Sequence, residues 1–266
     1  MPDRPLAVIT GGSSGIGATF ARKLAERKYD LLLIARREDR LRSLAAELAD
    51  TYHIEGQWMK ADLGADKDLE KVADRVRGAA NLGLLVNNAG FGAHGYFAES
   101  DVRVQEQMHR VHVLATMRLM HAALANLVPR GVGGIINVAS VAGFGQAPGS
   151  VSYNATKTWM NSFTEGIAME LGAKGSPVKV QSLCPGFTLS EFHDVLHADR
   201  SAIPSSLWMT ADFVVSESLR GFDEGKLFVI PGWRYKVIVA GMKLLPAALL
   251  RRAAVQGTRR FRKKKE

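Results

Sequence analysis

The strongest constraint on the fold is an alternation of short apolar runs with longer helical patterns along the 266-residue chain. Such runs, most of them rich in Val, Ile or Leu, cover 6–10, 31–35, 57–61, 84–87, 135–139, 178–183 and 227–230, and helical patterns cover 14–28, 37–50, 66–79, 100–128 and 152–172. Near-continuous apolar strands are expected when helices cover both faces of a parallel sheet. With right-handed crossovers, the pattern predicts a doubly wound, three-layer α/β/α fold whose ligand crevice lies at the carboxyl ends of the strands.

The chain is predicted to form a single domain, because no linker, low-complexity stretch or internal repeat interrupts it. Residues 1–232 would form the main α/β body, with an irregular loop-helix insert at about 187–212 near the ligand crevice. Residues 233–266 would extend the same domain, and 236–258 resembles an amphipathic helix pair broken at Pro246.

The net charge of +9 is confined to the end of the sequence. Residues 234–266 carry eleven Lys/Arg and one acidic residue, a net +10, so the rest of the chain is about −1 by subtraction. A neutral body without an interleaved aromatic platform disfavours nucleic-acid binding. Val237–Leu250 is too short to span a bilayer and is interrupted by Lys243 and Pro246. Two interpretations stay open: 236–265 contacts an anionic membrane surface, or its apolar part packs on the core or covers the substrate pocket.

One cysteine, Cys184, and a first segment without a signal-peptide pattern favour a reducing, cytoplasmic setting. No metal site is predicted.

A glycine-rich turn joins the first strand to the first helix. Glycines at such a junction let the backbone approach a pyrophosphate at a helix N-terminus. The spacing, Gly-x-x-x-Gly-x-Gly, differs from the commoner dinucleotide motif, and a plain tight turn is the alternative. The turn predicts a Rossmann-like phosphate cradle made of Gly11, Ser13, Ser14, Gly15, Ile16 and Gly17.

Cations follow the second strand where an acidic residue would bind the ribose hydroxyls of NAD. Ala35 occupies that position, and Arg36 and Arg37 follow it. Guanidinium groups bind a 2′-phosphate bidentately, so the pair predicts NADP(H) over NAD(H). The alternative is that both arginines are the solvated start of a helix.

Six motifs follow one another in order along the chain: the glycine-rich turn, Asp62-Leu63, Asn87-Asn-Ala-Gly90, Ser140, Tyr153-x-x-x-Lys157 and Pro185-Gly186-x-Thr188. Over about 5–232, this series resembles the compact, single-domain branch of the short-chain dehydrogenase/reductase superfamily. The resemblance implies a homodimer or homotetramer acting on a small carbonyl or alcohol substrate. It also implies cofactor contacts from Asp62 and Leu63 at the adenine, from Asn88, Ala89 and Gly90 along the central groove, and from Pro185, Gly186 and Thr188 at the nicotinamide. Alternatively, Asp62 caps a turn and the asparagines are turn formers.

Tyr153 is expected to be the general acid of a carbonyl reduction, supported by Lys157 on the same helix face. The lysine cation, with the positive charge of oxidised nicotinamide, is expected to lower the tyrosine pKa from about 10. Lys157 would also hold the nicotinamide ribose. Ser140 would hydrogen-bond the substrate oxygen, so that the two hydroxyls surround the developing negative charge. A surface helix is the alternative for the Tyr-x-x-x-Lys pair alone.

His112 occupies the position where many members of the superfamily carry an asparagine that places a water in a proton relay. A histidine there could hold the water or carry protons itself. Alternatively, it is a packed helix residue, and the match could fall one turn away at His109.

The predicted function is NADP-dependent interconversion of a ketone or aldehyde and a secondary alcohol. The insert suggests a hydrophobic substrate, such as a 3-oxoacyl compound, through Phe187, Leu189, Phe192, Leu196, Ile203, Leu207, Trp208 and Met209. The rival is a non-catalytic NADPH-binding or membrane-docking protein on the same fold.

Overall fold

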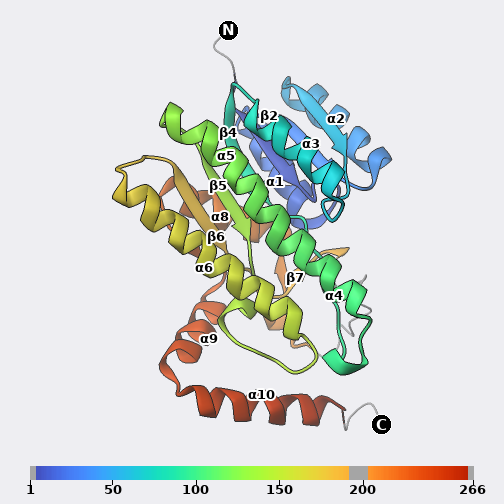
Figure 1. The fold of residues 1–266 in the computed structure, drawn as a ribbon, viewed down its shortest axis with the longest axis vertical. Helices are drawn as coiled ribbons and strands as arrows, with labels where there is room; N and C mark the ends of the chain where they lie inside the picture. The colour runs from blue at the N-terminus through green and yellow to red at the C-terminus, as the bar shows by residue number, and fades with distance from the viewer. Residues whose placement is uncertain (1–3, 192–202, 263–266) are drawn as a thin grey trace.

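Seven parallel strands form the central sheet of the protein (Figure 1). The structure is a computed structural model that describes residues 4–191 and 203–262, with side chains described up to residue 256. The strand order is β3-β2-β1-β4-β5-β6-β9. The strands are β1 (Leu6–Thr10), β2 (Asp30–Ala35), β3 (Gly56–Lys60), β4 (Leu82–Asn87), β5 (Gly134–Val138), β6 (Lys179–Leu183) and β9 (Phe228–Val229).

Helices cover both faces of this sheet and enclose two apolar cores. One face packs against α3 (Asp66–Arg77), α5 (Thr116–Arg130) and α6 (Val151–Ala173). The other packs against α1 (Gly15–Glu26), α2 (Glu38–Tyr52) and α8 (Ala211–Asp223). This arrangement explains why all five residues of β1 and of β5 are buried. The predicted doubly wound, Rossmann-like α/β fold is confirmed.

The strand order reverses between β1 and β4, and this reversal places a crevice at the carboxyl ends of the two strands. β1 pairs with β2 on one side and with β4 on the other, so the chain first extends the sheet in one direction and then in the opposite one. The connections that follow β1 and β4 therefore run in opposite directions along the sheet, and ligands bind in the crevice at this reversal.

A single helical rod runs from Val102 to Arg130 and combines α4 (Val102–His109), a π-helical segment (Arg110–Ala115) and α5. By length and composition it could cross a membrane, but 44% of its most apolar window is buried in the protein. Its apolar side packs against α3 and β4, as a core helix does. The π-helical turn adds a residue to the helix and places His112 in the interior.

Helix α8 is the element that the sequence pattern failed to predict. Its buried stripe consists of Val214, Val215, Ser218 and Leu219, and the serine interrupts the apolar signal. The Ser218 hydroxyl donates to Gln181 Oε1 at 2.6 Å, and Gln181 returns a bond to the Ser218 carbonyl at 3.1 Å. A satisfied polar pair thus replaces an apolar contact between α8 and β6.

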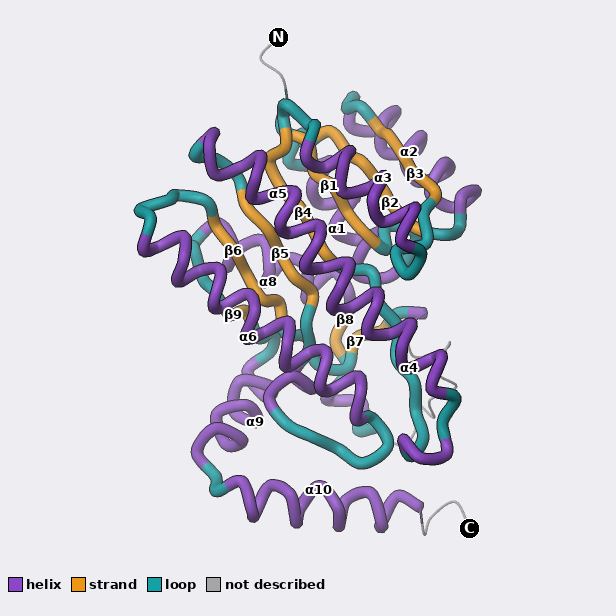
Figure 2. The backbone as a smooth tube through the Cα atoms, viewed as in Figure 1, coloured by secondary structure: helices purple, strands orange, loops and turns teal. Residues whose placement is uncertain are grey.

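The predicted insert contains little helix in its described part. A two-stranded parallel ribbon joins β7 (Thr188–Leu189) to β8 (Met209–Thr210), and a 3-10 turn covers Ser205–Leu207. Beyond the sheet, α9 (Trp233–Leu244) and α10 (Ala247–Arg262) form the predicted helix pair, with the break at Leu245 and Pro246. Figure 2 shows α10 lying beyond α9, away from the sheet.

Candidate active site

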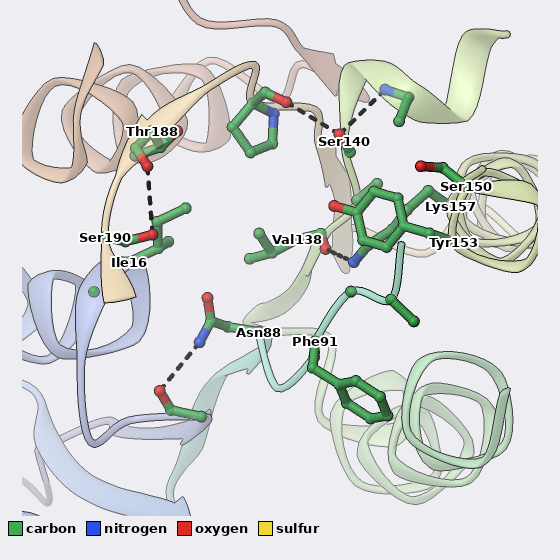
Figure 3. A pocket seen from close by; sticks show the side chains of 18 of the residues that line it. Ile16, Asn88, Phe91, Val138, Ser140, Ser150, Tyr153, Lys157, Thr188 and Ser190 are labelled. Carbon is green, nitrogen blue, oxygen red and sulfur yellow. Dashed lines mark hydrogen bonds between the residues drawn. The ribbon is translucent and has the colours of Figure 1, made fainter. Parts of the chain in front are cut away.

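One cavity of about 1330 Å³ lies at the carboxyl ends of the central strands. Ser140 and Tyr153 lie on one side of it, and Ile16, Thr188 and Ser190 lie on the opposite side (Figure 3). The predicted site residues that line it are Gly11, Ser13, Ser14, Gly15, Ile16, Arg36, Arg37, Asp62, Leu63, Asn88, Ala89, Gly90, Ser140, Tyr153, Lys157, Pro185, Gly186 and Thr188. Two are absent from the wall: Gly17 and His112.

The glycine-rich turn has a backbone that only glycine fits, because side chains at its glycine positions would be strained or would collide with neighbouring atoms. Gly11 has φ +65° and Gly15 has φ +54°, both in the left-handed region that favours glycine. A Cβ on Gly11 would lie 2.7 Å from Asn88 Nδ2. Gly17 serves packing instead, because a Cβ there would lie 2.3 Å from the Gly11 carbonyl oxygen. The turn fits a dinucleotide, because its backbone is open to close approach by a phosphate.

Thr10 and Asn88 connect the turn to the end of β4. The Thr10 hydroxyl oxygen accepts bonds from the backbone N–H groups of Asn88 at 2.9 Å and Ala89 at 3.0 Å. The Asn88 side chain donates to the carbonyls of Thr10 at 3.0 Å and Gly11 at 3.2 Å. These bonds hold the two loops together at the crevice, which is a structural task for the Asn-Ala pair.

The N-terminus of α1 points its positive end into the same cavity. The helix begins at Gly15, has no acidic residue in its first turn, and receives no side-chain cap from Ser14. Instead, the hydroxyls of Ser13 and Ser14 accept bonds from the Arg37 guanidinium at 3.0 and 2.6 Å. Hydroxyls, an arginine and a helix N-terminus form a donor set that suits an anionic cofactor.

Arg37 and Arg36 differ in their surroundings although both line the cavity. Arg37 also forms an ion pair with Glu191, which Arg40 shares. Arg36 has no hydrogen-bond or ion-pair partner among the side chains that the structure describes. Sequence reasoning missed Arg40 and Glu191, because their convergence depends on how the insert folds back over α2.

Asp62 combines the two roles that the sequence left open. It lines the cavity, and its carboxylate accepts a bond from the Gly64 backbone N–H at 2.9 Å. The carboxylate therefore shapes the turn after β3 while facing the place expected for the adenine.

Gly186, another residue of the cavity wall, packs so closely on Tyr235 that a Cβ at Gly186 would lie 2.0 Å from the tyrosine Cζ.

Ser140 and Tyr153 come together at the end of β5 and the start of α6. Ser140 has extended backbone, and its hydroxyl accepts a bond from the Ala142 N–H at 3.1 Å. It also donates toward the Pro185 carbonyl at 3.3 Å. A hydrogen bond between Ser140 and Tyr153 lowers the pKa of the phenol, although burial acts more strongly in the opposite direction.

Lys157 lies one helical turn after Tyr153 and is 5% exposed. Its ammonium donates to the Val138 carbonyl at 2.8 Å and lies 5.7 Å from the centre of the Tyr153 ring. Burial lowers the pKa of Lys157 to about 8, despite an opposing effect of the Cys184 thiol. The backbone of β5 thus positions the cation beneath the phenol.

The expected lowering of the tyrosine pKa by Lys157 does not occur in the chain alone. Burial raises the pKa of Tyr153 to about 12, because desolvation penalises the phenolate more than the Ser140 hydrogen bond favours it. Tyr153 therefore carries its proton at neutral pH. That is the form a carbonyl reduction requires from its acid.

His112 is fully buried behind the cavity wall, with both ring nitrogens engaged. Nε2 accepts a bond from the Phe91 backbone N–H at 3.1 Å, so Nδ1 carries the proton and contacts Thr156 Oγ1 at 2.9 Å. Burial, with smaller contributions from Lys157 and His109, lowers the pKa of His112 well below 6.5. This geometry favours the packed-residue interpretation over the proton relay. His109, the other candidate, is exposed and bonds to the Gln105 carbonyl at 2.9 Å.

Helix α9 supplies a wall of the cavity, in line with the interpretation that the apolar part of 236–265 covers the substrate pocket. Ile238 and Met242 line it, and Tyr235 anchors it. The Tyr235 hydroxyl donates to the Leu207 carbonyl at 2.7 Å and accepts from the Phe187 N–H at 2.9 Å. For α9, the structure thus favours packing over the pocket rather than contact with a membrane.

Apolar residues of the insert divide between two places. Phe187, Ile203 and Leu207 line the main cavity, whereas Trp208 and Met209 line a smaller one beside α9. Leu189 is 45% exposed. Phe192 and Leu196 lie outside the described residues.

A parallel sheet, a glycine cradle at the first crossover and a serine, tyrosine and lysine in one cavity define the class of nucleotide-binding oxidoreductases. Comparison with known families agrees. The short chain dehydrogenase family matches residues 5–201. The chain belongs to this family, whose members act on CH–OH and C=O groups.

Solved structures of the class resemble the chain over nearly its whole length. A short-chain dehydrogenase from Sphingobium yanoikuyae, in complex with NADPH, is 34% identical, with a TM-score of 0.81 over 98% of this chain and 96% of that one. A bulky-bulky ketone specific alcohol dehydrogenase from Comamonas testosteroni is 32% identical, with a TM-score of 0.78 over 92% and 96%. A very-long-chain 3-oxoacyl-CoA reductase from Macaca fascicularis is 30% identical over 70% of this chain and 60% of its own length.

Proposed function

We propose that the protein is an NADP-dependent oxidoreductase that interconverts a hydrophobic ketone or aldehyde and a secondary alcohol, with Tyr153 as the general acid. The observation that carries this proposal is the placement of a protonated, Ser140-bonded Tyr153 in the same cavity as the Arg37 and serine donors. One end of the cavity supports binding of a phosphorylated nucleotide, and the other supports carbonyl chemistry.

The chain's own residues would perform the proton and charge steps of the reduction. The cofactor supplies the hydride when it is bound. The hydroxyls of Ser140 and Tyr153 would hydrogen-bond the substrate carbonyl and stabilise the negative charge that develops on its oxygen. Tyr153 would then donate its proton to that oxygen. Lys157, held by the Val138 carbonyl, would stabilise the phenolate left behind.

The cavity composition supports a hydrophobic substrate. The cavity wall includes the apolar side chains of Phe91, Val141, Leu207, Ile238 and Met242. A relative that reduces very-long-chain 3-oxoacyl-CoA and a neighbour specific for bulky ketones agree with an extended apolar substrate.

Two measurements test the proposal. In fluorescence titrations, NADPH should bind at least about 10-fold more tightly than NADH, because a charge-assisted bidentate contact is worth about 1.5–3 kcal/mol. A panel of ketones of increasing apolar size, followed by NADPH absorbance, should show kcat/KM rising with size. Equal or tighter binding of NADH, or no turnover across the panel, would reject the corresponding half of the proposal.

The pH dependence of reduction should follow Lys157. Its pKa of about 8 means that the cation is present at neutral pH and is lost as the pH rises, whereas Tyr153, with a pKa of about 12, keeps its proton. We expect kcat/KM for a ketone, at saturating NADPH, to fall above about pH 8. The pH profile should show no titration of His112 near the usual histidine pKa, because its ring is neutral and both ring nitrogens are hydrogen-bonded. A flat profile up to about pH 10 would contradict this assignment.

The remaining sequence-based expectations stay predictions. A non-catalytic NADPH-binding role is disfavoured by the joint placement of Ser140, Tyr153 and Lys157 in the cavity. Membrane contact now concerns α10, where Leu249 and Val255 are 51% and 44% exposed and Arg251 and Arg252 are exposed with them. Loss of binding to anionic vesicles on changing both arginines to glutamine would support it. The cytoplasmic setting and the homodimer or homotetramer also remain predictions.

A further inference from the structure

Glu191 binds two arginines, of which Arg37 also contacts the serines of the glycine-rich turn. Its carboxylate oxygens accept bonds from Arg37 Nη1 at 2.7 Å and from Arg40 Nη1 at 2.5 Å. Glu191 follows β7 and lines the same cavity as Arg37. One acidic side chain from the insert therefore bridges two cations of the segment after β2.

Arg37 uses all three of its nitrogens at this point. Nε and Nη2 reach the hydroxyls of Ser13 and Ser14, and Nη1 reaches Glu191. A carboxylate and a phosphate present the same pair of acceptor oxygens to a guanidinium. The hydrogen bonds from Arg37 and Arg40 lower the pKa of Glu191 to about 2, so the carboxylate is charged at neutral pH.

We infer that Glu191 reduces the preference for NADP(H) over NAD(H) by occupying the arginine site that a 2′-phosphate would take. The inference rests on the proposed use of NADP(H). A phosphate group, which carries more charge than a carboxylate, displaces Glu191 from Arg37. An unphosphorylated ribose lacks that charge and leaves the Glu191 contacts in place. NADPH therefore binds against an internal competitor, whereas NADH does not.

The competition should be modest, because the ion pairs are partly exposed. The side chains of Glu191, Arg37 and Arg40 are 43%, 44% and 52% exposed. Ion pairs at such exposure are individually weak, and displacing two of them should cost NADPH about 3- to 30-fold in affinity. This internal contact lowers the affinity for NADPH without preventing its binding.

The test compares Glu191→Gln with Glu38→Gln in the full chain. Both remove one negative charge from the same region, but Glu38 pairs with Lys60 rather than with the arginines. In titrations, E191Q should bind NADPH about 3- to 30-fold more tightly and NADH unchanged. E191Q should also bind adenosine 2′-monophosphate more tightly than the unaltered protein does, by the same factor as NADPH. Its affinity for adenosine 5′-monophosphate should be unchanged. E38Q should change neither cofactor by more than about 2-fold.

Two outcomes would overturn the inference. Unchanged or weaker NADPH binding by E191Q would show that the carboxylate does not compete with the phosphate. An equal gain in NADPH affinity in E38Q would show that the effect comes from the net charge of the region. Failure of the proposed cofactor use is recognised separately, because Arg37→Gln would then leave NADPH affinity unaltered. If Arg37→Gln weakens NADPH and E191Q does nothing, only the role of Glu191 is lost.

Discussion

Replacing Tyr153 by phenylalanine should lower kcat for ketone reduction by about 100- to 10,000-fold, the usual contribution of a positioned general acid. The change removes one hydroxyl from a largely enclosed ring that contacts His112 edge-on at 5.9 Å between centroids. The packing of α6 should survive, and NADPH should bind with nearly the same affinity. Initial rates at saturating substrate, together with a fluorescence titration of NADPH, measure both quantities.

A matched variant is Tyr52→Phe, which removes a hydroxyl outside the cavity that donates to Glu26 at 3.3 Å. Its kcat should equal that of the unaltered protein. If Tyr153→Phe turned over at the same rate as Tyr52→Phe, the proton would have to come from another group and the proposed chemistry would be wrong.

Changing Arg37 to glutamine should weaken NADPH binding by about 10- to 100-fold, whereas the same change at Arg36 should have a much smaller effect. The reason is geometric, because Arg37 is fixed beside Ser13 and Ser14 at the N-terminus of α1. Arg36 lines the cavity without such a fixed position among the described side chains. The sequence alone could not separate the two arginines.

The affinity for NADH is the internal control for this pair of variants. NADH carries no 2′-phosphate, so both variants should bind it as the unaltered protein does. Equal losses of NADPH affinity in the two variants would place the phosphate between the arginines, and equal losses of NADH affinity would indicate damage to the turn itself. Calorimetric titration of each protein with both cofactors distinguishes these results.

The sheet and most of its helices could be predicted because strands such as β1 and β5 lie buried between two layers and read as apolar runs. The strand β3 is an exception, since its residues are exposed or only partly buried. β9 is only Phe228–Val229, shorter than the apolar run at 227–230 that predicted it. Helix α8 was lost because its buried stripe includes Ser218, which is satisfied by Gln181 on a distant strand. A periodicity argument cannot identify a polar residue whose partner lies 37 positions away.

The site was predictable where chemistry and local geometry coincide, as at the glycine-rich turn and at Tyr153 and Lys157. It was not predictable where residues distant in sequence converge. Arg37 and Glu191 are 154 positions apart, and Tyr235 contacts Leu207 and Phe187 from beyond the last strand. The pKa of Tyr153 in the chain alone was not predicted for a related reason, since burial depends on the complete fold and raises this pKa more than the Ser140 hydrogen bond lowers it.

The cavity wall supplied by α9 is separate from the residues that are proposed to react. The groups proposed to react lie just after β5 and on α6, whereas Ile238 and Met242 belong to a helix that follows the sheet. Met242 reaches so near Gly145 that a Cβ there would lie 2.2 Å from its terminal methyl. Exchanging side chains on α9 can therefore reshape the substrate cavity while leaving proton transfer untouched. Evolution, or directed evolution in the laboratory, could shift the substrate range of this enzyme through α9 alone.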